Sequence, residues 1–353
     1  MLNVKQHLGI ALLPTLLKNK IMRYSKITGL GYFVPETIVT NDDLAKLMDT
    51  TDEWIVERTG IKERRFFAEG VDTVSNMGKR AAEIAMQRAG KEANDIDMLI
   101  FATLSPDYNF PGSAVLAQRK LGLRSIPCFD IRQQCAGFLY ALSMADQYIK
   151  TGACKTVLII GSEIQSNIME ASDRGRNMSV IFGDGAGACV IEAHDQKGKG
   201  LLSTHLHADG RFAEELYLEH PGSRQKVRLT PAMINEGKLL PYMNGKSVFM
   251  NAVKYFPEAI REALMANDLK EEDLNLLVPH QANARITAAV QKELNLSDEQ
   301  VFSNIHKYGN TTAASIPIAL TEAWEQGRIK DGDLVCLAGF GSGFVWGSAL
   351  LRW

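Results

Sequence analysis

From residue 22 onward, short β-rich runs alternate with longer stretches of helical periodicity, and this alternation limits the folds that the chain can adopt. The helical stretches cover residues 75–90, 136–151, 247–267, 285–294 and 313–327. The β-rich runs are "DMLIFATL", "IPCFDI", "TVLIIGSE", "GACVIEA", "LNLLVP" and "DLVCLAGF". Residues 196–245 show neither pattern and are predicted to form an irregular connection with hairpin-like pieces. The pattern as a whole predicts an α/β fold.

A weak internal repeat indicates two similar halves. The segment "CAGFLYALSMADQYIKTGACKTVLIIGSE" and the later segment "NTTAASIPIALTEAWEQGRIKDGDLVCLAGFGSG" both read as helix, glycine turn and strand. Seventeen residues separate Cys135 from Gly152, and the same number separate Asn310 from Gly327. We therefore predict halves at 22–195 and 196–353, with a site between them to which each contributes one loop. Cys135 and Asn310 would then be equivalent positions, each at the N-terminus of a helix.

Residues 1–21, "MLNVKQHLGIALLPTLLKNKI", stand apart from this pattern as an N-terminal extension. Their short apolar centre, interrupted by Pro14, would suit a weak leader, a surface helix or an extension from a start codon upstream of Met22. A cleaved signal peptide is the least favoured reading, because the small-residue cleavage pattern is missing.

Charge and cysteine content exclude several classes of protein. The net charge of −2 provides no basic field for nucleic acid or an anionic membrane. No apolar run reaches the roughly 18 residues of a membrane span. The five cysteines are an odd number and form no CxxC pair. This predicts free thiols in a reducing compartment, and therefore a cytoplasmic protein.

Cys135 is the first candidate for chemistry, because it follows a β-rich run and comes just before a clean helical pattern. A free thiol has a pKa near 8.5, and its thiolate is the nucleophile. The start of a helix carries partial positive charge and unpaired N–H groups, so we expect a more acidic cysteine there. The alternative is an inert buried cysteine at a strand–helix turn.

Two other polar residues and a glycine-rich turn are candidates for the same site as Cys135. His280 ends the apolar run in "LLVPHQAN", and Asn310 follows Gly309 in "HKYGNTTAAS". Alone, each has a structural reading, as a satisfied histidine or as a turn or cap residue. The turn in "GFGSGFVW" allows close backbone approach and could supply an oxyanion N–H from Ser342, although, taken alone, the turn is better explained as a tight hairpin.

Other motifs are weaker. His205 and His207 lie two residues apart, but no third ligand follows at metal spacing. The run "FGDGAGA" lacks the Lys-Ser/Thr of a phosphate-binding loop, and its glycines are better explained by close strand packing.

The order Cys, His, Asn fits two unrelated chemistries. His280 follows Cys135 by 145 residues, within the window of about 130–150 for papain-like proteases. The protease signature around the nucleophile is absent, however, and the two-half α/β pattern does not suit that class. The second chemistry is acyl transfer between thioesters.

For this second chemistry the chain resembles β-ketoacyl-acyl carrier protein synthase III, a condensing enzyme of the thiolase superfamily, from Met22 to Trp353. The matching motifs are "DTTDEWIVERTGIKERR", "CAGFLYALSMADQYIKTG", "SDRG", "IFGDGAGA", "STHLHADG", "VPHQANARI", "GNTTAASIPIAL" and "GFVWGSALLRW". The resemblance implies a five-layered αβαβα fold built from two pseudo-repeated halves. It also implies a homodimer that needs no metal or redox cofactor.

The resemblance also implies roles for individual residues. Cys135 would be the acyl-accepting nucleophile, and His280 and Asn310 its partners. Coenzyme A would be held by Trp54, Arg58, Arg174, Phe249 and Asn283. Arg285 would dock the acidic carrier protein, and Phe110 would enter the acyl pocket of the neighbouring subunit.

The implied reaction is a decarboxylative condensation that starts fatty-acid or related synthesis. An acyl-CoA primer acylates Cys135, with the backbone N–H groups of Cys135 and Ser342 stabilising the oxyanion. Malonyl-acyl carrier protein then loses carbon dioxide, and His280 and Asn310 donate to the enolate oxygen. The carbanion attacks the acyl-cysteine and gives a β-ketoacyl-acyl carrier protein.

The chain departs from the family pattern near the substrate positions. Arg132, Gln133 and Gln134 stand where small residues are usual, and Lys246 replaces a typical Asn. "SPDYNFPG" is also bulkier and more polar than the usual run. We hypothesise a primer not restricted to acetyl-CoA, with medium chains accepted. The alternatives are another thiolase-fold acyltransferase of secondary metabolism, using a medium-chain donor, and a non-catalytic acyl-binding protein.

Overall fold

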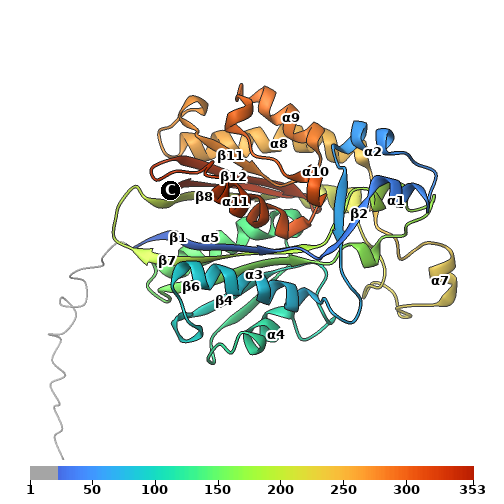
Figure 1. The fold of residues 1–353 in the computed structure, drawn as a ribbon, viewed down its shortest axis with the longest axis horizontal. Coiled ribbons are helices and arrows are strands. Elements are labelled where there is room, and N and C mark those ends of the chain that lie inside the picture. The colour runs from blue at the N-terminus through green and yellow to red at the C-terminus, as the bar shows by residue number, and fades with distance from the viewer. Residues whose placement is uncertain (1–22) are drawn as a thin grey trace, which may run out of the picture.

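The computed structural model describes residues 23–353, so the prediction for residues 1–21 lies outside the described residues. Two β-sheets lie roughly parallel, with α5 and α11 between them and further helices covering both outer faces (Figure 1). This is the five-layered αβαβα arrangement that the resemblance implied. Within this part of the chain, no helix is both long enough and apolar enough to cross a membrane.

The elements run as follows. The strands are β1 (Tyr24–Phe33), β2 (Thr37–Thr40), β3 (Glu63–Phe66), β4 (Met98–Ala102), β5 (Cys128–Ile131), β6 (Thr156–Glu163), β7 (Gly185–His194), β8 (Gly200–Ala208), β9 (Leu216–Tyr217), β10 (Tyr242–Met243), β11 (Leu276–Pro279), β12 (Leu334–Gly341) and β13 (Val345–Arg352). The α-helices are α1 (Asn41–Ala45), α2 (Asp52–Thr59), α3 (Val74–Ala89), α4 (Ser113–Lys120), α5 (Gly137–Lys150), α6 (Arg176–Ser179), α7 (Pro231–Asn235), α8 (Gly245–Met265), α9 (Ala284–Glu293), α10 (Ile305–Tyr308) and α11 (Ser315–Glu325).

The two large sheets repeat one topology. The first has the order β1-β7-β6-β4-β5 and the second the order β8-β13-β12-β11. In each, the strands in second and third place are antiparallel, and the next strand runs parallel to the third. The counterpart of β5 is reduced to a single parallel bridge between Leu277 and Val301. The predicted pseudo-repeat is therefore confirmed, and the proposed boundary after residue 195 falls between β7 and β8.

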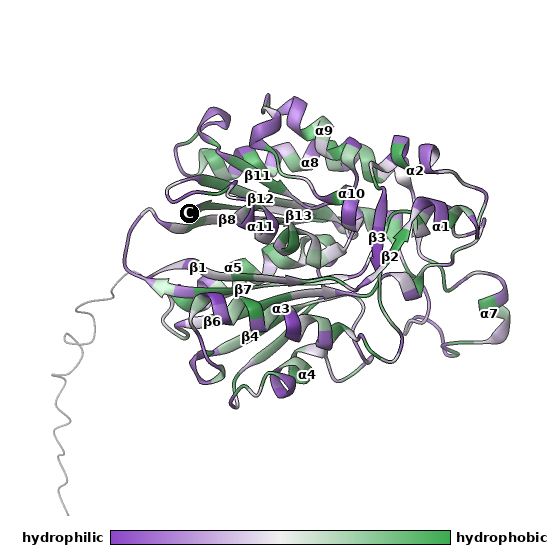
Figure 2. Cartoon of the chain, viewed as in Figure 1, coloured by the Kyte–Doolittle hydropathy of each residue, from purple (hydrophilic) through white to green (hydrophobic). Residues whose placement is uncertain are grey.

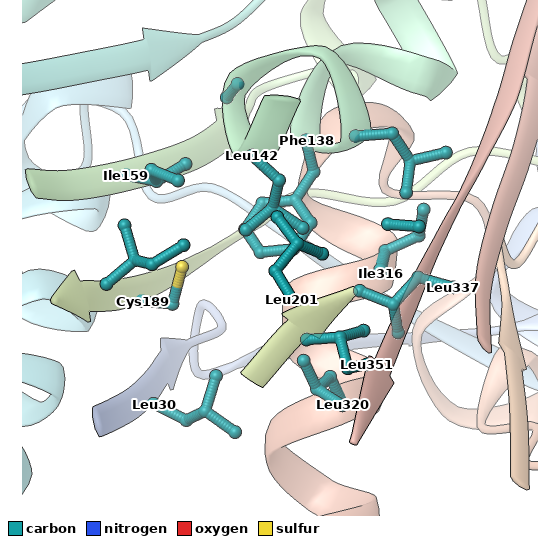
Figure 3. Packing of buried hydrophobic residues seen from close by; sticks show 14 of the residues in the cluster. Leu30, Phe138, Leu142, Ile159, Cys189, Leu201, Ile316, Leu320, Leu337 and Leu351 are labelled. Atoms are coloured by element: carbon teal, nitrogen blue, oxygen red, sulfur yellow. The ribbon is translucent and has the colours of Figure 1, made fainter. Parts of the chain in front are cut away.

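Three hydrophobic clusters hold the five layers together. The central cluster lies between the sheets and takes residues from both, including Phe138 and Leu142 of α5 and Ile316 and Leu320 of α11 (Figure 3). A second cluster packs α3 and α4 against the first sheet, and a third packs α8 and α9 against the second sheet. Because the inner strands are covered on both faces, β4, β6 and β12 are buried along their whole length.

The outer helices face water on one side. Along α3 and α9, hydrophilic and hydrophobic residues alternate (Figure 2), as expected for helices that bury one stripe against a sheet. The predicted helices agree with α3, α5, α8, α9 and α11 to within two residues at each end, and all six predicted β-rich runs are strands.

One segment was predicted wrongly. Residues 196–245 contain β8, which is the edge strand of the second sheet and pairs with β13 along its length. β8 was not predicted because its polar residues interrupt the apolar pattern expected of a buried strand. In the structure, these residues have partners on the flanking helices. Thr204 contacts Ser143 of α5 at 2.8 Å, and His207 contacts Glu262 of α8 at 2.6 Å.

The predicted equivalence of Cys135 and Asn310 is also wrong. A 3₁₀ turn precedes each central helix, Gln134–Ala136 before α5 and Thr312–Ala314 before α11. Gln134 and Thr312 both have positive φ, 41° and 53°, so Cys135 corresponds to Ala313. The equal spacings arose because α5 has 14 residues and α11 has only 11.

Candidate active site

A large cavity lies at the N-terminal ends of the two central helices. Its volume is about 990 Å³. This is at the upper end of the usual range for ligand pockets, about 300–1,000 Å³. Cys135, His280, Asn310 and Ser342 all line this cavity. The fold therefore brings together four predicted residues that come from both halves of the chain.

Cys135 lies in the turn between β5 and α5 and is 7% exposed. The end of β12 passes directly over it. A Cβ atom added to Gly341 would lie 2.7 Å from the Cβ of Cys135 and 3.1 Å from its Sγ. Only glycine leaves room for this approach, which brings the β12–β13 turn and its Ser342 to the nucleophile.

Burial dominates the acidity of Cys135. Desolvation raises the pKa of its thiol to about 12, the Glu163 carboxylate acts in the same direction, and a backbone hydrogen bond opposes them. The prediction of a more acidic thiol at the helix start is therefore wrong for this geometry, since the loss of water raises the thiol pKa by more than the backbone hydrogen bond lowers it. Cys135 rests as a thiol and needs a base when it attacks.

His280 is a second buried polar group that lines the same cavity. Its ring is 1% exposed, and Nδ1 contacts the Ser315 hydroxyl at 2.5 Å. Nε2 has no partner among the described residues, although it is buried. Burial lowers the pKa of His280 to about 3, so the ring is neutral at physiological pH. A neutral ring with a free nitrogen can accept a proton or donate a hydrogen bond, depending on its tautomer.

Asn310 is held by its backbone. Its N–H donates to Ile181 O at 2.9 Å, and its carbonyl accepts from the N–H of Gly183 at 3.1 Å. The side-chain oxygen accepts from the N–H of Thr312 at 2.9 Å, which leaves the amide NH₂ group as a donor. Asn310 and His280 both line the cavity, and within the described part of the chain each thus keeps a side-chain nitrogen free.

The residues assigned to coenzyme A fall into two groups. Phe249 and Asn283 line the cavity, whereas Trp54, Arg58 and Arg174 do not. Asn283 nevertheless donates to the carbonyl of Arg58 at 2.9 Å, and the Arg58 guanidinium lies 4.4 Å from the centre of the Trp54 ring. Trp54 and Arg58 therefore lie beside the part of the cavity that Asn283 lines.

Sequence analysis did not identify two residues near the cavity, Arg176 and Glu163. Arg176 also lies over Trp54, at 5.0 Å, and its position two residues after Arg174 in "SDRGRN" was the available signal. Arg174 itself is paired with Glu170 at 2.5 Å and donates to the carbonyl of Asn235 at 2.9 Å. The second missed residue is Glu163, treated below.

Glu163 is a fully buried carboxyl group at the end of β6. It accepts from the hydroxyls of Thr103 and Ser105 at 3.1 and 2.6 Å and from the amide of Gln165 at 3.1 Å. Burial raises its pKa to about 7, while these hydrogen bonds act in the opposite direction. Glu163 thereby anchors the loop after β4, whose residues Leu104 and Ser105 line the cavity.

The remaining predicted positions are distributed around this centre. Arg285 lines the cavity and lies 5.8 Å from the ring of Phe249. Phe110 is 83% exposed and does not line the cavity. Arg132, Gln134 and Lys246, three of the departures from the family pattern, do line it.

Many of the residues that line the cavity are apolar, and sequence analysis did not identify them. They include Leu104, Pro106, Ile168, Met169, Leu216 and Leu218. These residues come from three separate segments, so no local pattern marks them as neighbours.

The weaker motifs have structural roles. His205 and His207 both contact the Glu262 carboxylate, at 3.3 and 2.6 Å. Within residues 23–353, no group of three or more His, Cys, Asp or Glu side chains could hold a metal ion. In "FGDGAGA", a Cβ on Gly183 would lie 2.3 Å from Tyr308 O, so this glycine serves close packing as expected.

The acidity of Cys135 gives a first prediction. Because burial keeps the thiol protonated, its alkylation by iodoacetamide should be slow at neutral pH. The rate should rise by about tenfold per pH unit from pH 7 to 10, without a plateau. Mass spectrometry of the Cys135 peptide, with Cys135→Ala correcting for the other thiols, measures it. A plateau below pH 9 would contradict the assignment.

The approach of Gly341 to Cys135 gives a second prediction. Gly341→Ala should slow alkylation of Cys135 by about tenfold or more, since the added methyl group must displace the sulfur or the strand. Gly210→Ala is the matched control, because a Cβ there meets nothing within 4 Å. Equal alkylation rates in the two variants would show that the β12–β13 turn does not constrain the thiol.

Comparison with known proteins agrees with this geometry. The family described as 3-oxoacyl-[acyl-carrier-protein (ACP)] synthase III matches residues 129–210, and its C-terminal part matches residues 264–353. The β-ketoacyl-[acyl-carrier-protein] synthase III 1 of Vibrio vulnificus (strain YJ016) is 48% identical over 329 residues, 93% of this chain and 99% of that protein. The synthase III of Sulfurovum sp. (strain NBC37-1) is 45% identical over 93% of this chain and 95% of that protein.

Solved structures lead to the same family. The crystal structure of 3-oxoacyl-[acyl-carrier-protein] synthase III from Aquifex aeolicus VF5 has a TM-score of 0.85 and 42% identity, and it covers 93% of this chain and 100% of that chain. OleA from Xanthomonas campestris, at 20% identity and a TM-score of 0.81, shares the fold. This chain belongs to the 3-oxoacyl-[acyl-carrier-protein] synthase III family, which is also named β-ketoacyl-[acyl-carrier-protein] synthase III.

Proposed function

We propose that this protein condenses an acyl-CoA primer with malonyl-acyl carrier protein, through an acyl-cysteine intermediate, and so starts fatty-acid synthesis. The observation that carries the proposal is the convergence of three groups in one cavity. They are a buried cysteine, a neutral histidine with a free ring nitrogen, and an asparagine with a free amide NH₂.

In the first half-reaction, Cys135 attacks the thioester carbonyl of the primer. The thiol proton passes to Nε2 of His280 as the S–C bond forms, because the buried thiolate is too costly to form in advance. The backbone N–H groups of Cys135 and Ser342 stabilise the oxyanion. Collapse of the tetrahedral intermediate breaks the bond to coenzyme A, whose sulfur leaves with a proton, and Cys135 carries the acyl group.

In the second half-reaction, malonyl-acyl carrier protein occupies the cavity. Between the two half-reactions the neutral ring changes tautomer, so that Nδ1 accepts from the Ser315 hydroxyl and Nε2 carries the proton. Nε2–H of His280 and the amide of Asn310 then donate to the thioester oxygen of the malonyl group. The carboxylate leaves as carbon dioxide, and its bonding electron pair forms an enolate whose charge these two donors stabilise. The α-carbon then attacks the acyl-cysteine and breaks its bond to the sulfur of Cys135, and the departing thiolate takes a proton from water, since its own proton left with coenzyme A. Carbon–carbon bond formation and proton transfer balance without a metal or redox cofactor, so we propose that none takes part.

Substrate binding uses the basic and aromatic residues beside the cavity. We propose that Trp54, Arg58, Arg174, Phe249 and Asn283 hold coenzyme A. Arg285 is exposed and also lines the cavity, which suits contact with an acidic carrier protein that delivers its arm there. Arg176, stacked on Trp54, joins this group.

We further propose a cytoplasmic homodimer. All five cysteines are free thiols, which suits a reducing compartment. β5 is an edge strand of the first sheet, and Tyr108, Phe110 and Val115 near it are exposed. A second copy placed against this edge would cover them, and Phe110 would then reach the acyl pocket of the partner.

The two half-reactions separate the roles of the three residues. Cys135→Ala should form no acyl-enzyme. Asn310→Ala should still be acylated at close to the wild-type rate, whereas His280→Ala should be acylated more slowly, because it also loses the base that accepts the thiol proton. Malonyl decarboxylation should fall by about 10²–10³-fold in both, the usual cost of one oxyanion donor. Intact-mass spectrometry follows the first step, and release of labelled carbon dioxide follows the second. Normal decarboxylation in His280→Ala would remove the enolate assignment.

The apolar residues that line the cavity predict the primer class. Because Leu104, Ile168, Met169 and Leu218 line a cavity of about 990 Å³, butyryl- and octanoyl-CoA should acylate Cys135 at rates comparable to acetyl-CoA. A kcat/KM series from C2 to C10 measures this, with Cys135→Ala as the blank. A strict preference for C2 would restrict the protein to acetyl-CoA priming.

A further inference from the structure

Arg64 is a fully buried arginine on β3. Its Nη1 donates to the side-chain oxygen of Asn41 at 2.8 Å and to Val39 O at 3.3 Å, and its Nη2 donates to Val180 O at 2.8 Å. Burial lowers its pKa to about 10, so the guanidinium still carries its charge at neutral pH. Among residues 23–353 no carboxylate lies within salt-bridge distance of it.

Burying a charge that has no ion-pair partner lowers the stability of the folded protein, so the presence of Arg64 at this position indicates a function. The planar guanidinium gives what no other side chain can, several donors fixed in one fork. Here the fork joins two segments that are distant in sequence, residues 39–41 and Val180. Asn41 begins α1, Val39 lies on β2, and Val180 follows α6.

The Val180 segment carries Asn310. Ile181, the next residue, accepts the backbone N–H of Asn310 at 2.9 Å, and Gly183 donates to the Asn310 carbonyl at 3.1 Å. The backbone at Gly183 and Gly309 also packs closely against the aliphatic part of Arg64. A Cβ added to Gly183 or to Gly309 would lie 3.1 or 3.5 Å from the Cβ of Arg64. Arg64 therefore both binds this segment through its guanidinium and supports it with its aliphatic part.

The Asn41 contact extends the arrangement to α2. The amide of Asn41 donates to the Asp52 carboxylate at 2.8 Å and to Ile61 O at 2.7 Å. Asp52 is the first residue of α2, which carries Trp54 and Arg58, and Ile61 lies just after its end. The Arg64 guanidinium thus connects two parts of the structure by hydrogen bonds. They are the segment that holds Asn310 and, through Asn41, the helix α2 assigned to coenzyme A.

We propose that Arg64 is a positioning residue for the condensation step, because its hydrogen bonds fix residues 180–183 and through them the amide of Asn310. The inference rests on the proposed function, in which Asn310 donates to the enolate. Cys135 lies on a different turn, between β5 and α5, so we expect its acylation to depend on this segment less than decarboxylation does.

Arg64→Met removes all the donors and keeps most of the aliphatic length, while Arg64→Lys keeps the charge but loses the fork. At saturating acyl-CoA, we expect acylation of Cys135 within about twofold of wild type in both variants. Malonyl decarboxylation should fall by about tenfold to hundredfold in Arg64→Met, the range for a small misplacement of a catalytic group, and by less in Arg64→Lys.

Two reference variants make the result decisive. Ile96→Ala creates a cavity in the outer cluster around α3, far from this network, and should lower the melting temperature without changing the ratio of the two half-reactions. Asn310→Ala reports the loss of the donor itself.

The outcomes separate the two claims. Two outcomes would overturn the role of Arg64 alone. One is an equal loss of acylation and decarboxylation in Arg64→Met. The other is wild-type decarboxylation in Arg64→Met while Asn310→Ala is impaired. Wild-type decarboxylation in Asn310→Ala would overturn the proposed function and the inference together. If Arg64→Met does not fold, Arg64→Lys decides, since a selective loss of decarboxylation in it supports the role and an unchanged ratio of the two half-reactions rejects it.

Discussion

The burial of two helices between two sheets is the constraint from which the active site follows. α5 and α11 fill the space between the sheets, and their N-terminal turns meet. At Gly137 an added Cβ would lie 3.3 Å from the Cβ of Ala313, and at Gly161 it would lie 2.5 Å from Ala313 O. This close approach places the turn with Cys135 beside the turn that follows Asn310, so packing in the centre of the molecule sets the spacing of the reactive groups.

The same burial determines the protonation states at the site. Loss of water raises the pKa of Cys135 and lowers that of His280, so both groups are neutral before substrate binds. A neutral thiol beside a neutral imidazole avoids two buried charges, and the proton moves only when the thioester carbonyl is present to accept the sulfur. The histidine is then suited to both half-reactions, as a base in the first and a donor in the second.

Much of this arrangement could be predicted from the sequence, because local patterns carry it. Cys135, His280 and Asn310 each follow a recognisable strand or glycine and precede a helix, and all three line one cavity. Residues whose roles depend on distant partners left no such signal. Arg64 donates hydrogen bonds to residues 39, 41 and 180. The polar side chains of β8 have their partners on α5, which precedes β8 in the chain, and on α8, which follows it. The thiol pKa was predicted in the wrong direction because a helix start is visible in the sequence, whereas the depth of burial is not.

The central hydrophobic cluster has a consequence for how the two halves of the chain depend on each other. Each half contributes one central helix and one sheet to it, and the strand orders of the two sheets correspond around a pseudo-twofold axis. A single half would leave that apolar face open to water, and the surface best shaped to cover it is a second copy of the same half. The single chain thus has, within itself, the architecture of a dimer of two similar halves. The matching turns at its centre nevertheless carry different residues, Cys135 in one and Ala313 in the other.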